Sequence, residues 1–340
     1  MAPSVITPVT VLTGFLGSGK TTLLNRMLRD ARFADSAVIE NELGDVAIDH
    51  LLVRHASEDI VVLPGGCICC RASGDLIRAL RELHHQRSIG AVGPFKRVVI
   101  ETTGLADPAP ILASLIELPL LAARYSLAGV VTTVDAEYGM ATLDAQPEAV
   151  KQAALADRIV VTKADRAADR VDALEARLHA LNPGARIHRA LHGDLDPALL
   201  FDAGLFRPGA AAPDAAGWLS AGAYRRVGDP RPPHDPRISS FVWRAEEPLG
   251  WDDLERGLET LLDLLGDRVL RLKGLANVAG EPGPRAVHAV QHALYPPARL
   301  AAWPDADHST RIVFIGRDLE EAAVARILES FTRSSATQPR

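Results

Sequence analysis

Near its N-terminus the chain reads G-F-L-G-S-G-K-T at residues 14–21, which matches the pattern G-x-x-x-x-G-K-T. An apolar run at residues 9–12 precedes this segment and a helical stretch at 22–29 follows it. A strand before and a helix after are the context in which this pattern forms a phosphate-binding loop. Glycines let backbone N–H groups and the positive N-terminus of the helix converge on phosphate oxygens. The segment therefore predicts that the chain binds a nucleoside triphosphate.

Two side chains of this loop have predicted roles in handling phosphate. Lys20 is expected to reach the β and γ phosphates, and Thr21 to hold Mg²⁺ through its hydroxyl. Both are candidate catalytic residues, and Glu101, at the end of a later strand, is the third. The other loop residues expected to contact the nucleotide are Gly14, Gly17, Ser18 and Gly19.

Length and composition limit the possible classes of protein. A chain of 340 residues is too long for one ordinary core, so two domains are expected. With 47% hydrophobic residues, 24% charged residues and a net charge of −6, it reads as a soluble globular protein that binds neither nucleic acid nor membrane. No apolar span reaches the roughly 18 residues of a membrane helix, and no cationic segment opens the first ten residues, so we expect a cytoplasmic protein.

Strand and helix patterns alternate over residues 1–200 and predict an α/β fold with a doubly wound, mostly parallel sheet. Ligands are then expected at the carboxyl ends of the strands. The predicted strands are 9–13, 37–40, 60–63, 97–101, 129–135, 158–162 and 186–190, with helices that include 75–84 and 171–181.

The composition of the sequence changes after residue 200. Residues 201–237 are rich in Gly, Ala and Pro and predict a linker. A smaller α+β domain is expected at 238–333. Its predicted elements are strands at 238–244, 268–275, 285–290 and 311–315, and helices at 251–265 and 319–330.

The strand at 97–101 ends in a carboxylate, and the sequence continues T-T-G. After a phosphate loop, this pattern predicts that Glu101 stands beside Mg²⁺, through water, and that the Gly104 N–H senses the γ phosphate. The alternative is a buried strand that simply ends in an acid at a turn.

The strand at 158–162 leads into T-K-A-D at residues 162–165. A carboxylate at Asp165 can accept from both the ring N–H and the exocyclic amine of guanine, a pair of donors that adenine lacks. The motif therefore predicts GTP, with the stem of Lys163 packed over the base. A charged turn after a strand is the alternative.

All three cysteines fall in G-G-C-I-C-C at residues 65–70. An odd cluster of this kind predicts no disulfide framework. Cys67, Cys69 and Cys70 on a tight turn can direct thiolates at one Zn²⁺ or Cu⁺ and leave a coordination position open. Small buried hydrophobes and, less favoured, a redox dithiol are the alternatives.

Two carboxylates, Glu40 and Glu42, lie just past the second predicted strand. They could bind Mg²⁺, join the cysteine site or form a solvated turn, and we expect the second. The histidine pairs are interpreted as structural: His84 and His85 at a helix end, and His288 and His292 in a strand or turn.

These motifs resemble, in order, those of the CobW-like P-loop GTPases of the SIMIBI branch, and among them most closely the YjiA-type members. The resemblance rests on T-G-F-L-G-S-G-K-T-T-L-L, E-N-E-L-G-D, G-G-C-I-C-C, E-T-T-G-L-A-D-P and T-K-A-D, and in the second domain on R-I-S-S-F, L-K-G and T-R-I-V-F-I-G. It covers nearly the whole chain. One departure is that residues 227–237 contain a single histidine, His234, where many zinc-associated relatives carry a histidine-rich run.

The resemblance implies slow GTP hydrolysis coupled to handling of a transition metal, commonly zinc, and delivery of the ion to a client metalloprotein; a homo-oligomer is possible in such a protein. It adds Thr22 to the nucleotide loop and assigns metal handling to Glu40, Glu42 and the three cysteines. Two other classes stay open: a regulatory P-loop GTPase with a purely structural zinc, and an ATP-using P-loop kinase, against which Asp165 argues.

Overall fold

The structure is a computed structural model, and it describes residues 6–33, 35–40, 50–55, 60–64, 72–192, 194–201, 219, 224, 226–227 and 238–332, with the backbone alone at 50–55, 60–64 and 72–75. It divides into two compact units: Met1–Ala176 with Ala185–Arg207, and Arg177–Gly184 with Pro208–Arg340.

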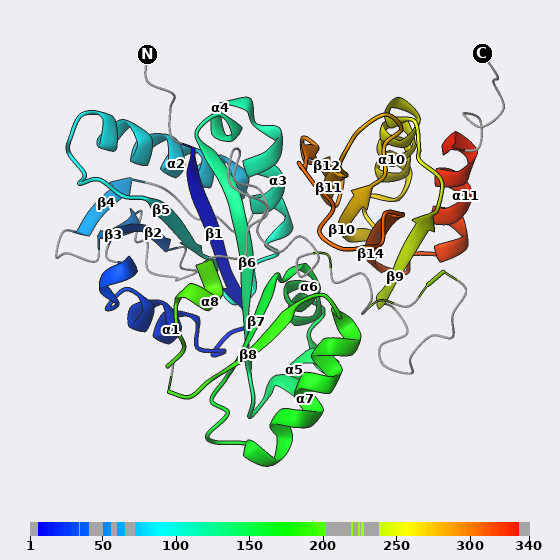
Figure 1. The fold of residues 1–340 in the computed structure, drawn as a ribbon. Helices are drawn as coiled ribbons and strands as arrows, with labels where there is room; N and C mark the ends of the chain where they lie inside the picture. The colour runs from blue at the N-terminus through cyan, green and yellow to red at the C-terminus, as the bar shows by residue number, and fades with distance from the viewer. Residues whose placement is uncertain are drawn as a thin grey trace. The chain divides into compact units, whose positions relative to one another are not determined.

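The first unit is built on an eight-stranded sheet with the order β4-β3-β2-β5-β1-β6-β7-β8 (Figure 1). Six neighbouring strands of this sheet are parallel: β2, β5, β1, β6, β7 and β8. Beyond β2 the sheet continues with β3 and β4, each antiparallel to its neighbour. The central strands are apolar and buried on both faces, as parallel strands between helices must be. The strands are β1 (Thr7–Gly14), β2 (Ser36–Glu40), β3 (His50–His55), β4 (Ile60–Pro64), β5 (Arg97–Glu101), β6 (Tyr125–Asp135), β7 (Arg158–Thr162) and β8 (Arg186–Ala190).

Helices cover both faces of this sheet. On one face, Leu23 and Leu24 pack in a buried cluster with Leu12 and Val131. The opposite face carries α6, because Thr132, the neighbour of Val131 on β6, donates its hydroxyl to the carbonyl of Gln152. The helices are α1 (Lys20–Met27), α2 (Ala72–Ser88), α3 (Ala109–Glu117), α4 (Pro119–Ala122), α5 (Gly139–Ala145), α6 (Pro147–Leu155), α7 (Ala168–Leu181) and α8 (Ala198–Phe201), with a 3-10 turn η1 (Ala31–Phe33).

The predicted fold class is confirmed, and each predicted strand of the first unit is present. One strand was not predicted: β3 forms between the second and third predicted strands and pairs with both of them antiparallel. The predicted places of His84 and His85, near the end of α2, are confirmed.

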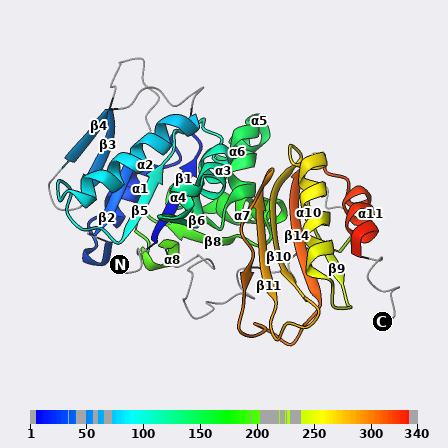
Figure 2. The ribbon, with the colours of Figure 1, turned by 90° about the horizontal axis from the view of Figure 1, so that it is seen from above.

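The second unit is an antiparallel sheet with the order β12-β11-β10-β14-β9, to which β13 adds by pairing with β11. Figure 2 shows α10 and α11 together on one side of it, over a core in which the rings of Phe241 and Phe314 stack with centroids 5.5 Å apart. His288 lies in β11 and His292 in the turn after it, as predicted. The elements are β9 (Ile238–Ala245), α10 (Trp251–Leu265), β10 (Val269–Ala276), β11 (Arg285–Val290), β12 (Ala293–Leu294), β13 (Ala298–Arg299), β14 (Thr310–Arg317) and α11 (Glu321–Thr332).

None of the helices that the structure describes is both long and apolar enough to cross a membrane.

Candidate functional site

The loop between β1 and α1 is shaped by its glycines. Gly17 and Gly19 have φ of 72° and 91°, a left-handed conformation that side chains disfavour. A Cβ on Gly14 would lie 2.3 Å from the hydroxyl of Thr133. Gly19 begins α1 without a side-chain cap, so the N–H groups of the first helical turn are available to an anion. This loop fits a phosphate chain.

Lys20 lies inside the loop. Its ammonium donates to the carbonyls of Gly14 at 2.8 Å and Phe15 at 3.1 Å, and the side chain is buried. Burial lowers the pKa of Lys20, and the nearby charge of Glu101 acts in the opposite direction. A phosphate placed here would give this buried cation a countercharge.

Two threonines brace the loop from neighbouring strands. The hydroxyls of Ser18 and Thr133 are 2.6 Å apart, and the Thr162 hydroxyl donates to the carbonyl of Ser18 at 2.7 Å. Ser18, predicted as a nucleotide contact, therefore uses its hydroxyl and carbonyl to fasten the loop to β6 and β7. Thr22, another predicted contact, is exposed.

Oxygen ligands suited to Mg²⁺ gather where β2 and β5 end. Thr21 donates its hydroxyl to a carboxylate oxygen of Glu101 at 2.6 Å. Glu40 lies opposite Glu101 in the parallel register, and both side chains are buried. The solvated-turn interpretation therefore does not describe Glu40. A hydroxyl and two carboxylates are the hard donors that this cation prefers.

The loop after β5 touches the phosphate loop. A Cβ on Gly104 would lie 2.5 Å from the backbone nitrogen of Leu16, so only glycine permits this approach. Helix α6 holds the same loop: Gln152 donates its side-chain amide to the carbonyls of Gly104 and Ala106, and Lys151 pairs with Asp107 at 2.5 Å. Neither α6 residue was predicted to belong to the site.

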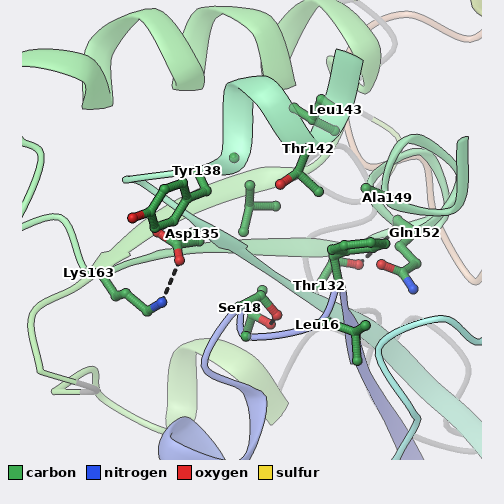
Figure 3. A pocket seen from close by; sticks show the side chains of 15 residues that line it. Leu16, Ser18, Thr132, Asp135, Tyr138, Thr142, Leu143, Ala149, Gln152 and Lys163 are labelled. Carbon is green, nitrogen blue, oxygen red and sulfur yellow. Dashed lines mark hydrogen bonds and ion pairs between the residues drawn. The ribbon is translucent and has the colours of Figure 1, made fainter. Parts of the chain in front are cut away.

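The T-K-A-D segment follows β7. Lys163 adopts a left-handed conformation with φ of 54°, and its ammonium lies 2.5 Å from the carboxylate of Asp135 at the end of β6 (Figure 3). This pairing, absent from the sequence interpretation, fixes the position of the Lys163 ammonium. Asp165 lies 3.6 Å from the ring of His192.

A cavity of about 320 Å³ lies beside the phosphate loop (Figure 3). The phosphate loop, the end of β6 and helices α5 and α6 form its walls. Its lining includes Leu16, Ser18, Thr132, Tyr138, Leu143 and Gln152.

The predicted metal site is largely outside the described residues: Glu42, Cys67, Cys69 and Cys70 all fall there. Over the part of the chain that is described, no group of three or more His, Cys, Asp or Glu side chains could hold a metal ion.

A parallel sheet whose first strand leads through a glycine-shaped loop into a helix, with Thr21 and Glu101 paired at its edge, defines a P-loop nucleotide-binding protein. Residues 8–189 match the family described as CobW/HypB/UreG, nucleotide-binding domain, and residues 238–332 match the cobalamin synthesis protein cobW C-terminal domain. The chain belongs to this family, and the resemblance predicted from its motifs is confirmed.

Two relatives are similar over almost their whole length. The zinc chaperone YjiA of Escherichia coli (strain K12) is 36% identical over 316 residues, which cover 93% of this chain and 96% of that protein. The zinc chaperone CobW of Pseudomonas aeruginosa is 31% identical over 363 residues, which cover 95% and 91%.

The fold is also that of a solved relative. The crystal structure of Zn(II)-bound YjiA GTPase from E. coli aligns with a TM-score of 0.72 at 30% identity, covering 96% of this chain and 99% of that one. A triple mutant of YjiA, with one glutamate and two consecutive cysteines changed to alanine, is likewise described as Zn(II)-bound and aligns equally well.

Proposed function

We propose that this chain is a Mg²⁺-dependent GTPase that binds a transition metal, zinc foremost, and couples GTP binding and hydrolysis to transfer of the ion to a client metalloprotein in the cytoplasm. The observation that carries the proposal is the meeting of Lys20, the Thr21–Glu101 pair and Gly104 at one loop, in a chain whose relatives are named zinc chaperones and GTPases.

The hydrolytic step asks the protein for positioning and charge neutralisation more than for covalent chemistry. Lys20 and the N-terminus of α1 would bind the phosphates, and Gly104 would donate its N–H toward the γ phosphate. Thr21 and Glu101 would hold Mg²⁺, which would supply positive charge against that of the phosphates. Slow intrinsic turnover is expected from the resemblance to the CobW-like GTPases.

Guanine recognition is assigned to Asp165, and the variant Asp165→Ala tests it. Loss of a paired, charge-assisted contact is expected to cost about 2–3 kcal/mol, or roughly 30- to 150-fold in GTP affinity. Competition of ATP and GTP for the wild-type protein is the accompanying measurement. Equal affinities for the two nucleotides would favour the kinase class instead.

Metal binding is assigned to Cys67, Cys69 and Cys70, with Glu40 or Glu42 as the fourth ligand. Thiolates must lose protons before they bind, so zinc affinity is expected to fall as the pH drops. Because the YjiA triple mutant is still Zn(II)-bound, zinc binding alone does not locate this site. The test is therefore to compare the number of zinc ions that Cys69→Ala and wild type bind in a titration. If the variant binds as many ions as wild type, the cysteines have no role in metal binding.

Coupling is what separates a chaperone from a GTPase with structural zinc. Linkage requires that if GTP changes zinc affinity relative to GDP, zinc must change the GTP-to-GDP affinity ratio by the same factor, for which we expect about 5- to 100-fold. The experiment is calorimetric titration of zinc into the GDP form and into the form bound to a nonhydrolysable GTP analogue. Identical dissociation constants, with hydrolysis insensitive to zinc, would reject the chaperone, and unfolding on chelation would favour structural zinc.

A further inference from the structure

Helix α6 is tied to the loop after β5 by side chains rather than by backbone. Gln152 donates its amide nitrogen to the carbonyl of Gly104 at 3.1 Å and to that of Ala106 at 3.0 Å. One residue earlier, Lys151 pairs with Asp107. Three of the four residues 104–107 are thus held from the same short helix.

The amide of Gln152 has only one possible orientation. Two carbonyl oxygens face one end of it, so that end must be the NH₂ group, and the oxygen points away from the loop. Gln152 is completely buried, and among the residues described its amide oxygen has no hydrogen-bond partner. Figure 3 shows the side chain at the cavity wall, beside Thr132 and Ala149.

Burying an amide whose oxygen is unsatisfied costs stability, which an apolar side chain at this position would avoid. The neighbouring positions of α6 are apolar and buried: Ala153, Ala154 and Leu155. Packing of α6 therefore does not explain a glutamine here. The two hydrogen bonds that it donates to the loop do.

The loop that Gln152 holds is the one that touches the phosphate loop. Gly104 approaches Leu16 so closely that a Cβ on Gly104 would overlap it. A displacement of residues 104–106 by even a few tenths of an ångström would move the Gly104 N–H relative to Gly17 and Lys20. GDP has no γ phosphate, so that displacement would leave the affinity for GDP unchanged.

We propose that Gln152 is a positioning residue for γ-phosphate recognition: it holds Gly104 against the phosphate loop and so sets how strongly the protein prefers GTP to GDP. The proposal rests on the proposed function, because it needs a GTP site at this loop. Lys151 supports the same loop from a more exposed position and contributes less.

The first test is Gln152→Leu, which keeps the volume of the side chain and removes its donors. Affinity for a nonhydrolysable GTP analogue is expected to fall about 5- to 150-fold, the range for two lost hydrogen bonds, while GDP affinity changes less than about twofold. Turnover should fall with the analogue affinity. Lys151→Met, which leaves the buried amide intact, should lower the ratio of analogue affinity to GDP affinity by about twofold.

The matched control is Thr132→Val. Thr132 donates its hydroxyl to the backbone carbonyl of Gln152, a hydrogen bond that joins α6 to β6 rather than to the loop. If Gln152 served only to pack α6, Thr132→Val would change the analogue-to-GDP ratio as Gln152→Leu does. We expect the ratio of Thr132→Val to equal that of wild type, and a parallel change would overturn the proposal.

The second test is Gln152→Glu, read against pH. A carboxylate at this position faces two carbonyl oxygens and repels them, whereas a protonated carboxyl can donate to one of them. Burial raises the pKa of a carboxyl, so the protonated form is reached under mildly acidic conditions. The analogue-to-GDP ratio of Gln152→Glu should therefore recover in part as the pH falls, with no such recovery in Gln152→Leu.

The outcomes separate this proposal from the proposed function. If wild type itself bound no GTP analogue, the proposed function would fail. If wild type bound and hydrolysed GTP, and the folded variants Gln152→Leu and Gln152→Glu showed the wild-type ratio at every pH, the positioning role alone would be wrong. Circular dichroism and thermal unfolding establish that each variant is folded.

Discussion

At the scale of single residues, the chemistry of the site depends on a lysine placed where lysines are costly. Lys20 is buried, burial lowers its pKa, and its ammonium contacts two backbone carbonyls of the loop. The side chain contributes little to the apolar core, so its placement reflects what it binds rather than what it packs against. For the same reason, replacing Lys20 should affect turnover much more than the stability of the fold.

We therefore expect Lys20→Met to abolish turnover without unfolding the protein. Loss of the charge should remove at least about 3 kcal/mol of transition-state stabilisation, or more than about a hundredfold in rate. Because a buried charge also disappears, the unfolding temperature should stay unchanged or rise. Hydrolysis assays and thermal unfolding of the same preparation measure both, and a folded variant with the wild-type rate would contradict the assignment.

A second residue, His188 in β8, makes stability depend on pH. Burial lowers the pKa of His188, and the charges of Arg158 and Arg186 lower it further. Below the ordinary imidazole value of about 6.5 the unfolded chain takes up a proton that the folded chain does not. The free energy of unfolding should therefore fall as the pH drops through this window, and His188→Gln should show a flatter dependence in urea unfolding between pH 7.5 and 5.

At the scale of elements, the site depends on how closely two loops approach. Gly104→Ala adds a methyl group 2.5 Å from the backbone of Leu16, a contact that backbone atoms must move to relieve. We expect binding of a GTP analogue and turnover to fall roughly tenfold or more, an estimate that assumes loss of one oriented donor. GDP binding serves as the internal reference, and equal losses for both nucleotides would mean that the whole loop is displaced instead.

Much of this arrangement follows from local sequence signals. The phosphate loop, Glu101 and Lys163 are recognisable because each stands at the end of an apolar strand and is followed by turn residues. Parallel strands bring their carboxyl ends to one edge, which is why residues 80 or more positions apart could be expected to meet. The register that sets Glu40 opposite Glu101 needed the structure.

Other parts of the structure could not be predicted, because no local pattern in the sequence indicates them. Strand β3, H-L-L-V-R-H, has only three apolar residues in succession and no regular alternation of apolar and polar side chains. Gln152 looks like an ordinary polar position of an amphipathic helix, and Asp135 like any acid at a strand end. Their roles depend on partners 28 to 48 positions away, which spacing along one segment does not reveal.

At the scale of the whole molecule, each of the two units has a hydrophobic core of its own. A buried cluster of the first unit lies under α1 and α8, and that of the second unit lies between its sheet and its two helices. The residues of the proposed nucleotide site lie in the first unit. A ligand stabilises only what it binds, so nucleotide should not stabilise both cores equally.

Differential scanning calorimetry should accordingly resolve two unfolding transitions, of which GDP raises one. At a free concentration about 100 times the dissociation constant, the gain is about 2.7 kcal/mol for the unit that binds. Lys20→Met, with the phosphate contact removed, provides the matched control. Equal shifts of both transitions, or a single transition in all conditions, would contradict independent cores.

The position of β1 also has a consequence for synthesis on the ribosome. This strand carries the phosphate loop yet lies between β5 and β6, and the loop is fastened by Thr162 at the end of β7. Strand β1 must therefore wait for about 90 further residues before β5 exists and for about 120 before β6 does. At about 5–20 residues per second, the wait for both strand partners is roughly 6 to 24 seconds. Until β5 is made, the nascent chain carries an unpaired apolar strand that a chaperone could shield, and the phosphate loop can be fastened by Thr162 only after most of the first unit has been translated.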